Sequence, residues 1–198
     1  MLLAACASPK TKTEERSGAT VRSLNYSAKE IFSISVERPG EPNSGAGGDA
    51  LNPYSSGGMI CCFGVPSVWR PDLKVVVKYK FYPETEYRKA LVSIPPYPDG
   101  KASQIWLIVH EDESAEAVVS HYGPSRDEWP GKVKGYPVPS REYRLKLWEE
   151  KMQQEKAELA SFEREIRNPK LSQEKRDGYQ ETIHQIKESI QYLENHKP

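Results

Sequence analysis

The segment LKVVVKYKF, residues 73–81, is the most strand-like stretch of the sequence and decides the class of its first part. β-Branched and aromatic residues, which favour strands, fill it, and three lysines lie between them. A Pro-Asp pair at residues 71–72 precedes it and favours a tight turn. We therefore expect a β-rich body built around residues 73–81.

Working outward, five further segments have strand character and end at turn-forming residues: 31–36, 59–65, 90–94, 104–110 and 115–121. The last two flank an acidic turn and predict a β-hairpin. Residues 40–58 are rich in Gly, Ser, Asn and Pro, which predicts a long irregular loop. Six short strands separated by turn signals are typical of an antiparallel, sandwich-like body.

After Pro139 the pattern changes from turn-rich to helical. Apolar residues recur at steps of three and four over about 141–167 and 173–195, with Glu155 at one polar core position. Asn168-Pro169 ends the first helix. Ser140 and Ser172 are suitable N-caps. Two narrow apolar stripes predict an antiparallel helical hairpin.

The fold class we expect is therefore α+β, an antiparallel β-sandwich-like body followed by a C-terminal antiparallel helical hairpin. The expected divisions are residues 1–23 as lipobox and flexible tether, 24–139 as the β-rich domain, and 140–198 as the hairpin. The tether is inferred because residues 8–23 are polar and charged, with few large apolar side chains.

Composition excludes some functions. Of 198 residues, 28 are basic and 28 are acidic, so the formal net charge is zero. Proteins that bind nucleic acid without a narrow specificity usually carry a basic domain or a basic stripe on their surface. The sequence also lacks an apolar run near the roughly 20 residues of a membrane-spanning helix. We expect neither a nucleic-acid binder nor an integral membrane protein.

The sequence LAAC, ending at Cys6, matches the bacterial lipobox, in which a lipid-modified cysteine follows the cleavage site. The residue after the cysteine is Ala7 and not the Asp that is associated with retention in the inner membrane, which favours a location at the outer membrane. We expect a lipoprotein with Cys6 as the lipidation site, on the periplasmic face of the outer membrane. Only five residues precede Cys6, so we expect either an upstream start or Met1 as an internal start that gives a cytosolic form.

Cys61 and Cys62 are adjacent within an expected strand, where neighbouring side chains point to opposite faces. A disulfide between them would need a distorted backbone. We therefore expect at least one thiol to be a small buried apolar side chain. No His lies near the pair, so we expect no metal site there.

Residues with catalytic potential do not assemble into a recognisable enzyme site. The glycine-rich residues 45–50 fit a loose dinucleotide fingerprint, but the following Leu-Asn-Pro prevents the helix that such a motif must open. His110 and His121 end neighbouring strands beside acidic residues, and we interpret them as solvated imidazoles rather than a metal or acid–base site. We expect a non-enzymatic protein with no cofactor and no metal, and keep an unrecognised hydrolase as a lesser alternative.

Four segments resemble a family of bacterial lipoproteins catalogued as a domain of unknown function. They are GGMICC at 57–62, PSVWRPDLKVVV at 66–77, IPPYPDG at 94–100 and HYGP at 121–124. The resemblance covers roughly residues 24–130 and leaves out the helical tail. Several members of that family are immunity proteins encoded beside phospholipase effectors of type VI secretion systems.

The resemblance implies an immunity protein that binds and inhibits a cognate phospholipase (lipase) effector, as one half of an effector–immunity pair. The alternative is a structural or ligand-binding lipoprotein of the cell envelope. For an inhibitor we expect protein–protein contacts through exposed loops, where aromatic and charged side chains often dominate binding. The candidate contact residues are Asp112, Glu113, Tyr97, Trp129 and Tyr136.

Overall fold

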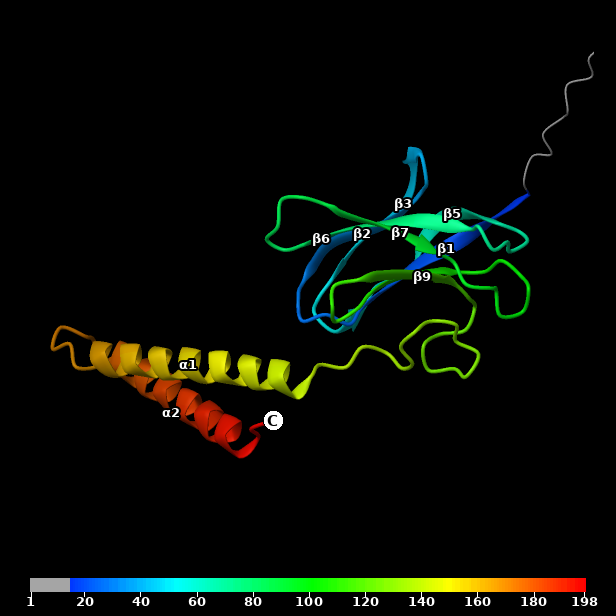
Figure 1. Ribbon diagram of the computed structural model, residues 1–198. Coiled ribbons are helices and arrows are strands. Elements are labelled where there is room, and N and C mark those ends of the chain that lie inside the picture. Colours follow the sequence, from blue (N-terminus) through cyan, green and yellow to red (C-terminus); the bar gives the residue numbers. More distant parts are fainter. Residues whose placement is uncertain (1–14) are drawn as a thin grey trace, which may run out of the picture. The chain divides into compact units, whose positions relative to one another are not determined.

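The computed structural model describes residues 15–198, which divide into two compact units. The first is rich in strands and ends at Val138, and the second is Pro139–Pro198. Cys6, the expected lipidation site, lies outside the described residues. Figure 1 shows the strands of the first unit and the two helices of the second.

Nine strands lie in the described part of the first unit, residues 15–138. They are β1 (Arg16–Asn25), β2 (Ile31–Arg38), β3 (Glu41–Leu51), β4 (Ser55–Ser56), β5 (Ile60–Pro66), β6 (Lys74–Phe81), β7 (Arg88–Ser93), β8 (Ile105–Val109) and β9 (Ala115–Val119). The second unit contains α1 (Arg141–Glu165) and α2 (Gln173–Asn195). The expected α+β class is confirmed.

Two sheets make up the β-rich unit. Sheet A has the order β4-β1-β8-β9, and β5 also pairs with β1. Sheet B has the order β3-β2-β6-β7 and is antiparallel throughout. In sheet A the β8–β9 hairpin is antiparallel as expected, and one pair, β1 with β8, runs parallel.

One apolar core lies between the two sheets. Sheet A contributes alternate residues such as Val21, Ile105 and Leu107, and sheet B contributes Val36 and Val77, all of them at most 2 % exposed. Alternation places every second side chain of a strand on the core side. Burial of each aliphatic side chain of this kind contributes about 1.5–3 kcal/mol. Sheet pairing and this shared core define the unit.

A second, smaller cluster covers the outer face of sheet A. Residues 120–138, here named the covering segment, follow strand β9 (Figure 1). Their Trp129 packs on Trp106 of β8. The two rings meet edge to face with centroids 5.3 Å apart. The Tyr26 hydroxyl donates a hydrogen bond to the carbonyl of Gly135, 2.7 Å away. Strand β8 is therefore buried on both faces.

Two expectations for the N-terminal half are wrong. Residues 16–23, expected in the tether, belong to strand β1, and Ala19 and Val21 are buried in the core. Residues 40–58, expected as an irregular loop, contain strands β3 and β4. The glycines hid β3 because its pairing with β2 uses backbone groups, with register shifts along the pair. A Cβ at Gly47 (φ +108) would lie 3.0 Å from the Ile34 carbonyl oxygen, so the close approach of β2 and β3 requires glycine.

The helical unit has the two capped helices that the sequence predicts. Ser140 and Ser172 accept hydrogen bonds from the backbone N–H groups of Tyr143 and Lys175, and so cap α1 and α2. Met152 and Ile186 are buried, each 6 % exposed. Near the start of α1 and the end of α2, the indole N–H of Trp148 donates a hydrogen bond to the backbone carbonyl of Leu193.

Glu155 occupies the predicted polar core position and is likewise buried. Its carboxylate lies 2.7 Å from the Nζ atom of Lys151. This ion pair gives the buried charge a partner, as a charge at such a position requires.

Candidate partner-binding surface

Within residues 15–138, no segment covers the outer face of sheet B as the covering segment covers sheet A. Burial alternates strictly along β6, with Val75, Val77, Tyr79 and Phe81 toward the core. The remaining positions point outward, and their cross-strand partners on β2 and β7 lie on the same face. Lysine and leucine side chains of β6 and β7 lie there with Phe32 of β2, and Tyr82 and Tyr87 lie beside them at the two ends of the β6–β7 connection. We name this set the lysine–aromatic face: Phe32, Lys74, Lys78, Lys80, Tyr82, Tyr87, Lys89 and Leu91.

The apolar members of this face are well exposed. Leu91 is 60 % exposed and Tyr82 is 62 % exposed, and Phe32 is 52 % exposed. Isolated apolar side chains on a surface are ordinary, but a group on one sheet face marks a candidate interaction site. Phe32 and Leu91 lie on paired strands, so their backbone positions are fixed before any partner arrives, whereas Tyr82 lies in the turn that directly follows β6.

Lysines hold the aromatic rings in defined positions. The Nζ atom of Lys80 lies 4.2 Å from the ring centroid of Phe32 and 5.1 Å from that of Tyr87. The Nζ atom of Lys78 lies 4.5 Å from the Tyr87 centroid and 3.6 Å from the Glu37 carboxylate. Cation–π contacts of this kind contribute about 0.5–1 kcal/mol at exposed sites. The result is a partly ordered surface that is both apolar and positive.

The acidic turn between β8 and β9 contains two of the predicted contact residues, and they behave differently. Asp112 is exposed, and its carboxylate accepts hydrogen bonds from the backbone N–H (2.9 Å) and the hydroxyl (2.6 Å) of Ser114. These bonds hold the pKa of Asp112 below its ordinary value. Asp112 therefore remains available to a partner while it stabilises the turn.

Glu113, by contrast, links the turn to sheet B. Its carboxylate pairs with Lys29 at 2.5 Å and with Arg88. The hydrogen bonds from Lys29 and then Arg88 lower the pKa of Glu113. The Tyr79 hydroxyl donates to the Glu113 carbonyl, 2.7 Å away. Because these interactions occupy Glu113 within the molecule, its first role is structural.

Two predicted contact residues are buried, and their assignment to exposed loops is wrong. Trp129 is 4 % exposed, packs on Trp106, and donates from Nε1 to the Val133 carbonyl at 2.9 Å. Tyr97 is 4 % exposed, and its hydroxyl donates to the Pro66 carbonyl at 3.1 Å. Each ring closes an apolar cluster and satisfies its polar atom internally. Tyr136 is exposed, as an interface residue must be.

The two histidines do not form a joint site. His110 is buried, and its Nε2 lies 2.8 Å from the carboxylate of Glu116. His121 is exposed and lies 3.3 Å from Asp99. The expectation of two solvated imidazoles is thus wrong for His110. Among residues 15–198, no three or more His, Cys, Asp or Glu side chains are grouped to hold a metal ion.

Tyr26 lies beside the buried His110–Glu116 pair, with its ring stacked on that of His110 at a centroid distance of 6.1 Å. Burial, and then the Glu116 carboxylate, raise the pKa of Tyr26 to about 12. The phenol therefore stays protonated at neutral pH and can keep its hydrogen bond to the covering segment. The cluster serves packing under the covering segment.

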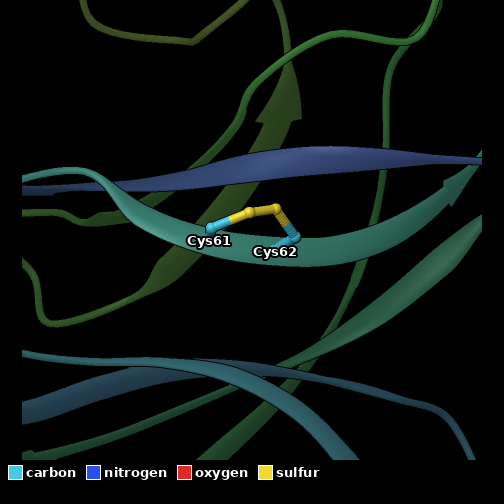
Figure 2. Close-up of a disulfide and its surroundings, with 2 residues drawn as sticks. All are labelled: Cys61 and Cys62. Atoms are coloured by element: carbon cyan, nitrogen blue, oxygen red, sulfur yellow. A yellow bond between two sulfur atoms is a disulfide. The ribbon is translucent and has the colours of Figure 1, made fainter.

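Cys61 and Cys62 differ from the expectation. Both side chains are exposed and joined in a disulfide, as Figure 2 shows, and the peptide bond between them is cis. The expectation of a buried thiol assumed a regular strand, in which neighbouring side chains diverge. The pair lies on β5 of sheet A and is separate from the lysine–aromatic face on sheet B.

Sequence reasoning missed the lysine–aromatic face, although part of its signal was present. The lysines of residues 73–81 were recognised as the polar side of a strand. The partners that complete the surface are Phe32, on strand β2, and Tyr87, which directly precedes β7, and only the pairing of sheet B brings them beside Lys80. No helix in residues 15–198 has the length and apolar character needed to cross a membrane.

Comparison with known proteins gives one match. The family described as "Protein of unknown function (DUF3304)" matches residues 24–117, just under half of the chain. The matched stretch includes the whole of sheet B and the acidic turn, and it excludes the whole covering segment and the helical unit. No curated protein matches, and no solved structure matches.

Proposed function

We propose that this protein binds and inhibits a secreted phospholipase effector, and that the lysine–aromatic face is its docking surface. The single observation that carries the docking proposal is the group of exposed aromatic and leucine side chains, with lysines between them, on the outer face of sheet B. The choice of a phospholipase rests on the resemblance of residues 57–77 and 94–100 to lipoproteins that act as immunity proteins.

Aromatic side chains are suited to this role because a partner that covers them removes a large apolar area from water. Phe32, Tyr82 and Tyr87 each offer a ring, and interface energies are concentrated in such residues. Phe32 lies on a paired strand, and the Phe32 and Tyr87 rings already contact lysine side chains, so less conformational entropy is lost when they are covered.

The four lysines define the partner's chemistry. Lys74, Lys78, Lys80 and Lys89 lie on one face, whose buried Glu37 pairs with Lys78. An acidic surface on the enzyme, with an apolar depression for the rings, would complement them. Opposite charge across an interface raises the association rate and makes it depend on salt.

The location of the protein belongs to the same proposal. A lipid on Cys6 would hold it at the periplasmic face of the outer membrane, where a toxin delivered to the periplasm must be met. A form that starts at Met1 without export would be cytosolic. Asp112 and Tyr136 are exposed and are the predicted contact residues that remain candidates for the rim of the interface.

The test measures phospholipase turnover with the enzyme encoded by the neighbouring gene and an excess of the full chain. We expect a complex on a sizing column and loss of lipase activity, with an association rate that falls as salt rises. Undiminished turnover with no complex would overturn the proposal and favour a structural or ligand-binding envelope lipoprotein.

The docking surface is tested with charge reversal. Lys78→Glu with Lys80→Glu should weaken binding at least about tenfold, because two favourable charges become repulsive. The matched control is Lys101→Glu with Lys134→Glu, which makes the same charge change at exposed positions away from sheet B. Equal loss in both pairs would show that net charge, not this face, governs binding.

A further inference from the structure

Strand β7 is a free edge of sheet B. The sheet order places β6 on one side of β7, and within residues 15–198 no strand pairs with its other side. Its residues Lys89, Leu91 and Ser93 are exposed. An exposed edge presents backbone N–H and C=O groups to which an extended segment can add as a further strand.

The ladder between β6 and β7 shows which backbone groups of β7 face away from the sheet. The Ile94 N–H donates to the Leu73 carbonyl at 3.0 Å, and the same register continues with Val92 opposite Val75. In an antiparallel pair, hydrogen-bonded positions alternate with non-hydrogen-bonded ones along the strand. Every second residue back from Ile94 therefore bonds to β6, and the residues between them point their backbone groups to the free edge: Lys89, Leu91 and Ser93.

A hollow of about 670 Å³ lies beside this edge and gives room for side chains. Val92 of β7 and Ala115 of β9 border the hollow, and both pack, partly buried, against the core between the sheets. Trp69 forms another wall, and its indole N–H donates to the Ile94 carbonyl at 2.9 Å. On a strand added beside β7, side chains that point inward at the level of Val92 would enter this mainly apolar hollow.

The outward side chains of β7 favour an acidic occupant. Lys89 lies directly opposite Lys78 of β6, and like charges opposed in this way are destabilising. Lys78 has the Glu37 carboxylate at 3.6 Å, whereas in the described part of the chain no carboxylate lies within ion-pair distance of Lys89. A carboxylate on an added strand could pair with Lys89 in the same cross-strand row. A second copy of this chain would instead bring another lysine-rich face.

We propose that the free edge of β7 binds an extended segment of the phospholipase as a further strand of sheet B. Acidic side chains of the segment lie outward beside Lys89, and apolar side chains lie inward in the hollow. Main-chain hydrogen bonds hold the segment, and the alternation of its side chains selects it. The identity of the partner rests on the proposed function, whereas the chemistry of the segment follows from the edge, the hollow and Lys89.

The edge is tested first without the enzyme, by NMR of the ¹⁵N-labelled full chain. The probe is the peptide acetyl-EVEVEVE-amide, which alternates acidic and apolar side chains, and acetyl-KVKVKVK-amide is its charge-reversed control. We expect the acidic peptide to slow amide hydrogen exchange at Lys89, Leu91 and Ser93 at least about tenfold, whereas Ala90 is already protected by β6. The basic peptide should bind at least about tenfold more weakly.

A pair of variants at one position separates the backbone from the side chain. Leu91→Pro removes an edge-facing N–H and leaves the ladder with β6 intact, because proline is tolerated where the N–H of an edge strand faces solvent. It should weaken binding of the acidic peptide about tenfold. Leu91→Ala is the matched control, since it removes the same side chain but keeps the N–H, and it should bind within about threefold of wild type.

Lys89→Glu decides the matter if Leu91→Pro does not fold. It should weaken binding of the acidic peptide and strengthen binding of the basic one, because the charge beside the added strand is reversed. The proposal is overturned if the two peptides bind wild type equally, or if the protected amides lie outside β7. Protection of these amides in a dimer of the free chain would assign the edge to a second copy and overturn it as well.

The enzyme arm distinguishes failure of this proposal from failure of the proposed function. The concentration of protein needed for half-inhibition of the phospholipase should be at least about tenfold higher for Leu91→Pro than for Leu91→Ala. Equal inhibition by the two variants would overturn the edge as a docking site, while the proposed inhibition would stand. Peptide binding with no inhibition by wild type would overturn the phospholipase as partner in both proposals, while the peptide site on β7 would stand.

Discussion

Sheet A and sheet B each turn one face to the shared core, but their outer faces differ in composition and in covering. On sheet A, Trp106 and Ile108 of β8 point outward and are buried beneath Trp129 of the covering segment. On sheet B, the corresponding outward positions of β6 include Lys78 and Lys80, and the neighbouring Phe32 stays exposed.

The difference can be traced to the strand sequences. Residues 105–109 are apolar without interruption, so a strand of this sequence must be buried on both faces. Residues 74–81 place lysines between apolar residues, so one face can remain in water. The outer face of sheet A is therefore completed within the molecule, whereas the outer face of sheet B can be completed by a partner.

The largest effect on stability is expected from uncovering sheet A. Trp129→Ala removes the ring that packs on Trp106 and exposes the outer face of β8. We expect a loss of about 3–5 kcal/mol in the free energy of unfolding, measured by chemical denaturation. The effect should arise in the β-rich unit and be seen in the near-ultraviolet circular dichroism of its tryptophans.

Tyr136→Ala is the matched control, since it removes an exposed aromatic ring from the same segment. It should change the free energy of unfolding by less than about 1 kcal/mol. If the two variants were equally stable, the covering segment would not be an integral layer of the β-rich unit.

The helical unit provides a second buried seam for comparison with the open face. Ile186→Asp places an unpaired charge at a position that is 6 % exposed. We expect a loss of about 3 kcal/mol from the helical unit, through lost burial and desolvation of the carboxylate. Circular dichroism at the helical wavelength should show the lower melting temperature, and Tyr192→Asp, at an exposed position of the same helix, should melt near wild type.

Structural features that depend on local sequence patterns can be predicted from this sequence, whereas features that depend on long-range contacts cannot. The heptads placed α1 and α2 within about two residues, because helix periodicity and capping are local properties. Strand β6 was found from its own composition. Strand β3 was missed because its glycines and serines pair through the backbone, which composition does not reveal.

The candidate site was less predictable than the fold. Trp129 and Tyr97 lie in segments rich in Pro and Gly, which suggested exposed loops, and only their long-range contacts with Trp106 and the Pro66 carbonyl bury them. The lysine–aromatic face requires the register of three strands. Both features depend on which distant residues meet, and a single sequence does not state this.

A moderate effect on stability is expected at the β8–β9 turn of sheet A, whose Glu113 forms an ion pair with Arg88 of sheet B. Glu113→Gln removes the charge that pairs with Lys29 and Arg88, and should cost about 1 kcal/mol at neutral pH. The lowered pKa of Glu113 means that its contribution is present above the ordinary carboxyl range and is lost as pH falls through the lowered value. Denaturation at pH 7 and pH 3 measures this, and the difference between variant and wild type should shrink at the lower pH. A constant difference would assign the effect to packing.

The smallest effect on stability is expected on the open face, where binding should respond instead. Phe32→Ala combined with Tyr87→Ala removes two exposed rings and the cation–π contacts that they make with Lys78 and Lys80. We expect the free energy of unfolding to fall by about 1 kcal/mol at most, since the exposed contacts share Lys80 and Tyr87 and their contributions do not add. Loss of interface aromatics should weaken binding of the phospholipase by about 30-fold or more, because truncation of a central ring costs at least about 2 kcal/mol. Stability is measured by denaturation and affinity by titration of enzyme inhibition.

A large loss of stability would mean that sheet B uses these rings as sheet A uses Trp129, and the contrast between the two faces would fail. Unchanged affinity with unchanged stability would place the docking surface elsewhere, and the exposed residues Asp112 and Tyr136 would be the next to substitute.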